Sequence, residues 1–79
     1  MTPAEREDQI SEMTLEAVDG LMQKLPMLTD RKNAMGVLLI ISYNLLRSAE
    51  SDEFMRGWLE SALEDVKHNA PAMELKGAH

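Results

Sequence analysis

The side chains best suited to chemistry in this chain are Glu60, Glu64 and His68, which recur at intervals of four residues. On a helix this spacing places all three on one face, where carboxylate and imidazole groups can bind a divalent metal. The same pattern is typical of a solvated face with a histidine near the helix C-terminus, where the helix dipole favours positive charge. We prefer the second interpretation, and the sequence predicts neither a bound metal nor a cofactor.

The other ingredients of an active site are missing from the sequence. General acid–base catalysis needs two carboxylates in contrasting environments, and every acid falls on an expected polar face. Ser42 and Tyr43 have no histidine nearby in the sequence to activate a nucleophile, and no glycine cluster is present to hold a phosphate. Cysteine is absent, which excludes disulfides and thiolate metal sites. We therefore expect no enzyme, but a protein that acts by binding.

An apolar run from Met35 to Leu46 contains no charged residue and has to be buried. It lies in an expected helix over residues 30–49, with Thr29 or Asp30 as N-cap and with apolar residues over more than half of the circumference. The run is too short to span a bilayer, which needs about 20 apolar residues. The start of the chain is acidic and unlike a signal peptide, so a cytoplasmic protein is expected.

Two amphipathic helices are expected on either side of the central one. The first covers residues 3–25, where Thr2 caps the start and Pro26 ends the helix. The third covers residues 52–68 and has the clearest helical spacing of apolar residues, with Met55, Trp58, Leu59, Ala62, Leu63 and Val66 in its stripe. Its N-cap is Ser51 or Asp52.

These elements predict an all-α fold, a three-helix up-down-up bundle with helices at about 3–25, 30–49 and 52–68. A single domain covers residues 1–70, and residues 71–79 form a disordered tail without a hydrophobic pattern. A chain of 79 residues buries only about 60–65% of its unfolded surface, and its central helix has more apolar surface than two neighbours need. We therefore expect the fold to be completed by homodimerisation.

The candidate interface is a strip on the central helix formed by Gly36, Ile40, Tyr43 and Arg47. Small Gly36 permits close approach, and tyrosine and arginine are favoured interface residues. The alternative is that this strip faces solvent. Further candidate interface residues are Met27, Leu28 and Phe54, for which the preferred alternative is that they cap the core.

Charge limits the class of partner. Fourteen acids and eight bases give a net charge of −6, so the chain is repelled by nucleic acid and anionic lipid. Only residues 26–49 are net positive, and Asp52 and Glu53 disfavour placing the third helix in a DNA groove. We expect a protein partner with a basic surface and an adaptor or inhibitor, such as a phage or mobile-element accessory protein. The alternative is an acidic DNA mimic that inhibits a nucleic-acid-binding protein.

Overall fold

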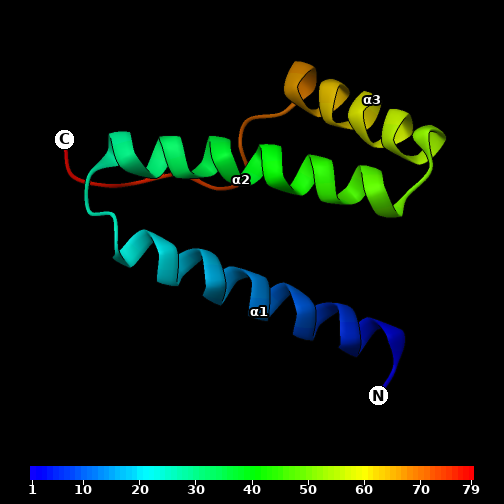
Figure 1. Cartoon of the computed structure of the whole chain (residues 1–79), viewed down its shortest axis with the longest axis horizontal. Coiled ribbons are helices and arrows are strands. Elements are labelled where there is room, and N and C mark those ends of the chain that lie inside the picture. Colours follow the sequence, from blue (N-terminus) through cyan, green and yellow to red (C-terminus); the bar gives the residue numbers. More distant parts are fainter.

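Three α-helices joined by short connectors make up the computed structural model, which describes all residues 1–79 (Figure 1). α1 covers Pro3–Gln23, α2 covers Leu28–Ala49 and α3 covers Asp52–His68. The only β-type pairing is an isolated bridge between Met27 and Ala78. The predicted all-α class is confirmed. None of the three helices combines the length and hydrophobicity needed to cross a membrane.

The starts of α1 and α3 follow the local capping signals. The hydroxyl of Thr2 accepts a hydrogen bond from the backbone N–H of Glu5 at 3.2 Å. The hydroxyl of Ser51 accepts one from the backbone N–H of Phe54 at 3.1 Å. Each hydroxyl satisfies a backbone donor that has no partner inside its helix, which fixes where the helix begins.

The start of α2 differs from the prediction. The helix begins at Leu28, and neither Thr29 nor Asp30 is its N-cap; Met27 occupies that position without a side-chain hydrogen bond. The N–H of Leu28 instead donates to the carbonyl of Ala78 at 2.8 Å, so a distant segment supplies the acceptor that a local cap otherwise provides. The helix therefore starts two residues earlier than its local sequence indicates.

Arg31 ties the end of α1, the start of α2 and the C-terminal tail together. Its guanidinium donates to the carbonyls of Met22 at 2.9 Å and Leu25 at 2.5 Å, and to the carbonyl of Lys76 at 2.7 Å. The carbonyl of Met22 belongs to the last turn of α1 and also accepts from the N–H of Leu25, whereas the carbonyl of Leu25 lies in the connector just after the helix. Both lie near the C-terminal end of α1, where the helix dipole favours a cation. We call this set of three hydrogen bonds the Arg31 clamp.

The tail returns from α3 along α2 and ends beside the start of α2 (Figure 1). The N–H of Ala78 donates to the carbonyl of Pro26 at 2.9 Å. Residues 70–79 contain no helix, and only the bridge at Ala78 gives them regular pairing. Disorder of residues 71–79 in solution stays a prediction, but these contacts give the end of the tail a defined place.

The helices do not form a closed bundle. α2 and α3 run antiparallel and make the only substantial helix–helix contact, whereas α1 lies on the side of α2 opposite α3 (Figure 1). Only two residues are buried, Met22 at 9% exposure and Met55 at 4%. The predicted up-down-up bundle is thus not confirmed for the single chain, although the number and order of its helices are.

The molecule is larger than a compact monomer of its mass. Its radius of gyration is 14.8 Å, whereas a compact chain of this length has about 12 Å. Its accessible surface is 6886 Å², whereas a folded monomer of this mass has about 4,800 Å². The single chain therefore exposes on the order of 2,000 Å² more than a closed domain does.

Substituting alanine for Gly77 is expected to loosen the tail. A Cβ atom there would lie 2.9 Å from the backbone nitrogen of Leu28 and 3.0 Å from its Cα, too close for real atoms. We expect backbone amide exchange at Leu28 and Ala78 to become about tenfold faster, since overpacking costs about 1–3 kcal/mol.

The matched control is Gly20→Ala in α1, where a Cβ meets nothing within 4 Å. Because alanine is the better helix former, this change is expected to stabilise the protein by up to about 1 kcal/mol. Unchanged exchange at Leu28 in the Gly77→Ala variant would contradict the close contact between tail and helix.

Candidate functional site

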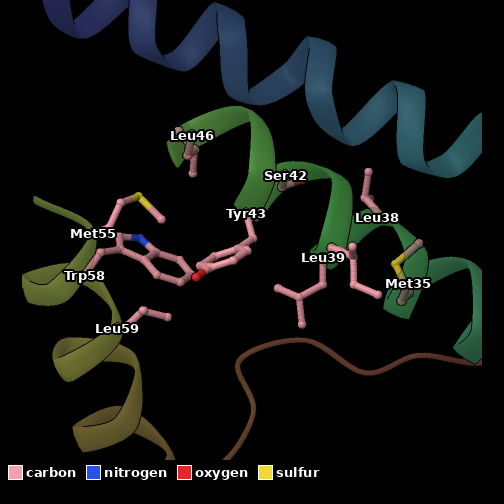
Figure 2. A pocket seen from close by; sticks show the side chains of 10 residues that line it. Met35, Leu38, Leu39, Ser42, Tyr43, Leu46, Met55, Trp58 and Leu59 are labelled. Atoms are coloured by element: carbon pink, nitrogen blue, oxygen red, sulfur yellow. The ribbon is translucent and has the colours of Figure 1, made fainter. Parts of the chain in front are cut away.

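An open apolar groove of about 580 Å³ lies between α2 and α3 (Figure 2). Nine of its ten lining residues are hydrophobic. The lining consists of Met35, Leu38, Leu39, Ile40, Ser42, Tyr43 and Leu46 from α2, and of Met55, Trp58 and Leu59 from α3. We call this cavity the α2–α3 groove. Its chemistry suits an apolar helix face and offers almost nothing to a charged ligand.

Helical spacing explains why these residues meet. Met35, Leu39, Ser42 and Leu46 follow one another at intervals of three or four residues, so they share one side of α2. Trp58 and Leu59 lie three and four residues after Met55, so these three share one side of α3. The two-residue connector of Glu50 and Ser51 brings the two helices together as an antiparallel pair whose facing stripes line the groove.

Two aromatic rings meet in the groove. Figure 2 shows the ring of Tyr43 next to that of Trp58, with Met55 and Leu59 beside them. Tyr43 is 37% exposed and Trp58 is 48% exposed, although Met55 beside Trp58 is buried. The single chain thus leaves half of its only tryptophan open to solvent.

Arg47 forms part of the rim of this site. Its guanidinium carbon lies 5.7 Å from the centroid of the Tyr43 ring, and its Nη2 lies 3.8 Å from Oδ1 of Asp52. Both charged side chains are more than half exposed, so the ion pair contributes little to stability. The cation–π contact favours the orientation in which Tyr43 lies beside the groove.

The residues of the predicted Gly36/Ile40/Tyr43/Arg47 strip do not share one environment in the structure. Ile40, at 63% exposure, and Tyr43 line the α2–α3 groove, whereas Arg47 is engaged with Tyr43 and Asp52 at its rim. A Cβ at Gly36 would meet nothing within 4 Å, so the single chain leaves that position open. Whether the strip is an interface stays a prediction.

The other predicted interface residues are separated from the groove. Met27 is 41% exposed in the connector before α2, where it pairs with Ala78, and Leu28 beside it is half-buried. Phe54 is exposed in the first turn of α3. None of these three residues lines the α2–α3 groove.

Trp58, Leu59, Met35 and Leu39 are groove residues that sequence reasoning placed in the core. Their spacing correctly identified the apolar stripes of α2 and α3, but it did not show that those stripes stay open. The available signal was the excess of apolar positions on α2 over what two neighbouring helices can cover.

α1 carries a second open apolar face. Ile10, Met13 and Leu21 are exposed at one-third or more of their surface, and Ala17 lies between them at helical spacing. We call these four residues the open face of α1. Val18, which is partly buried, and Met22, which is buried, lie toward the C-terminal end of this helix.

The polar constellation on α3 lies on the outer surface. Glu64 is paired with His68 at 3.2 Å and with Lys67 at 3.4 Å, and all three side chains are mostly exposed. Glu60 lines the same shallow hollow. No group of three histidine, cysteine or acidic side chains is arranged to hold a metal ion. No polar or charged residue is buried.

No protein-family model matches the chain, and no curated protein or solved structure is significantly similar to it. Its function is therefore inferred from the groove, the helix faces and the charges described above.

Proposed function

We propose that this chain is a small acidic protein–protein interaction module, an adaptor or inhibitor that works as a homodimer and carries out no catalysis. The observation that carries the proposal is that the single chain exposes about 2,000 Å² more total surface than a compact monomer and leaves many large apolar side chains of α1, α2 and α3 exposed. Obligate homodimers bury roughly 1,000–2,500 Å² per subunit, so one self-association can remove the excess.

The partner of the dimer is a protein with a basic surface. The acids of α1 and α3 are exposed, among them Glu12, Glu16 and Asp19 on α1. None of these three forms an ion pair within the chain. Unpaired acids favour association with a positively charged surface and disfavour acidic partners.

A second candidate function is that of an acidic DNA mimic that blocks a nucleic-acid-binding protein. The observation in its favour is that Glu60, Glu64 and Asp65 surround one shallow hollow on α3. A mimic and the DNA it imitates compete for the same site. Release of a captured partner by added duplex DNA would favour the mimic, and retention would favour the adaptor or inhibitor.

Sedimentation equilibrium tests the homodimer. We expect twice the chain mass of 8.9 kDa at micromolar concentration. Trp58 supplies an independent signal, because the only tryptophan is 48% exposed in the single chain and becomes covered in a dimer that closes the groove. Its emission is expected to shift to longer wavelength on dilution. A mass of one chain with constant emission over the whole concentration range would overturn the proposal.

A further inference from the structure

We propose that the α2–α3 groove is filled by α1 of a second copy of this chain, and that the exchange is reciprocal. Each subunit then inserts its own α1 into its partner and receives the partner's α1 in return. This inference rests on the proposed homodimer and specifies its geometry. It is a helix-in-groove interaction in which groove and helix belong to the same sequence.

The first argument is that the chain exposes both halves of this contact. The open face of α1 presents aliphatic and thioether groups that the single chain leaves between one-third and three-fifths exposed. The α2–α3 groove presents an apolar lining with exposed residues such as Leu39 and Trp58. A two-fold axis lets both surfaces be covered at once, because each contact then occurs twice.

The second argument is the match in length. The open face of α1 runs from Ile10 to Leu21, and the lining on α2 runs from Met35 to Leu46. Each stretch spans eleven helical steps, which is about 17 Å at 1.5 Å per residue. One α1 can therefore cover the whole length of the groove.

The third argument is that α1 cannot reach the groove of its own chain. α1 and α3 lie on opposite sides of α2 (Figure 1). The Arg31 clamp holds the end of α1 against the start of α2 through the carbonyls of Met22 and Leu25. Folding α1 over onto α3 would break these hydrogen bonds, so a second copy has to supply the helix.

Charge supports the same pairing. Residues 1–25 carry six acids and two bases, whereas residues 26–49 carry one acid and three bases. An α1 placed along α2 of the partner therefore brings a negative segment next to a positive one. This attraction is confined to the α2 side of the groove, because residues 50–79, which include α3, carry seven acids and three bases. Two copies of α2 placed against each other would instead bring two positive segments together.

Engineered cysteines test the exchange, because the chain has none of its own. One chain carries Ala17→Cys in the open face of α1. A second chain carries a cysteine in the groove at one of three places along it, Met35→Cys, Ser42→Cys or Leu46→Cys. The two chains are unfolded together, refolded and mildly oxidised, so a disulfide between them can form only in trans.

We expect at least one of the three mixtures to give a covalent dimer. It can contain up to about half of the chains, because random pairing of two equally abundant variants places about half of them in mixed dimers. A disulfide forms only where the two Cα atoms lie about 4.4–6.8 Å apart. Three groove positions are therefore used, so that the one nearest Ala17→Cys identifies the register of α1 along the groove. The matched control is Asp19→Cys, on the opposite face of α1, which is expected to give several-fold less product with each groove variant.

Each other outcome overturns the exchange. Absence of cross-linking in all three mixtures would contradict it. A covalent dimer formed mainly by Ser42→Cys with itself would contradict it as well, because that product indicates contact between two α2 helices. A disulfide within one chain carrying both Ala17→Cys and Ser42→Cys would show closure in cis. Sedimentation of the same samples separates the two proposals: a non-covalent dimer without cross-links removes only the exchange, and a monomer removes the homodimer as well.

Discussion

Replacing Arg31 with methionine is expected to lower the free energy of unfolding by about 3 kcal/mol, because three charge-assisted hydrogen bonds are lost together. The guanidinium donates to the carbonyls of Met22, Leu25 and Lys76, which belong to two distant segments of the chain. The expected loss is smaller than the sum of three such bonds, since Arg31 is only half-buried and water can reach the freed carbonyls. Methionine preserves the apolar stem and its contacts.

Urea denaturation followed by circular dichroism measures this effect, with all variants compared at one protein concentration because dimerisation adds to apparent stability. Arg31→Lys is the matched control: it keeps the charge at the end of α1 but lacks the planar fork that reaches three carbonyls. It is expected to recover less than half of the lost stability. A midpoint for Arg31→Met equal to that of the natural chain would show that the clamp contributes nothing.

The parts of the fold that the sequence predicts are those encoded within one or two turns of chain. Thr2 and Ser51 cap α1 and α3 because the hydroxyl and the free N–H are three residues apart. α3 ends at His68 as predicted, and the N–H of Asn69 bonds to the carbonyl of Asp65. Such signals act locally, so they can be read without knowledge of the remaining chain.

The parts that the sequence does not predict depend on residues far apart. α2 starts early because Ala78, fifty residues away, accepts the N–H of Leu28. The clamp is equally hidden in the sequence, since nothing near Arg31 indicates that Lys76 will supply a carbonyl to its guanidinium. Gly77 shows the same limit, because its close approach to Leu28 exists only in three dimensions.

The sequence predicts the apolar faces that line the groove, but of the candidate interface residues only Ile40 and Tyr43 lie in it. Helical spacing identifies Trp58, Leu59 and Leu39 as apolar-face residues, and the structure places all three in one groove. Spacing does not say whether such a face is covered by its own chain or by another. The direction of α1 decides this, and that direction follows from the connector and the Arg31 clamp.

Replacing Tyr43 with glutamate is expected to convert the dimer into a monomer at micromolar concentration. Tyr43 lies in the α2–α3 groove beside Trp58, where the proposed partner helix covers it (Figure 2). Burying a carboxylate in a covered apolar site costs about 3 kcal/mol or more when it has no partner, and pairing with Arg47 at the rim offsets part of this cost. A two-fold dimer carries the change twice, so even half of that cost at each site, about 3 kcal/mol in total, raises the dissociation constant by at least about 100-fold.

The measured quantity is the mass by sedimentation, with Trp58 emission on dilution as a second signal. In the free chain the new carboxylate is four residues before Arg47, and this spacing allows an ion pair along the helix. The helical circular dichroism signal is therefore expected to persist in a folded monomer. Tyr43→Phe is the matched control, because it keeps the ring in the groove and is expected to remain dimeric. A Tyr43→Glu chain that dimerises as tightly as the natural one contradicts a covered groove, since no buried site accepts that charge without loss.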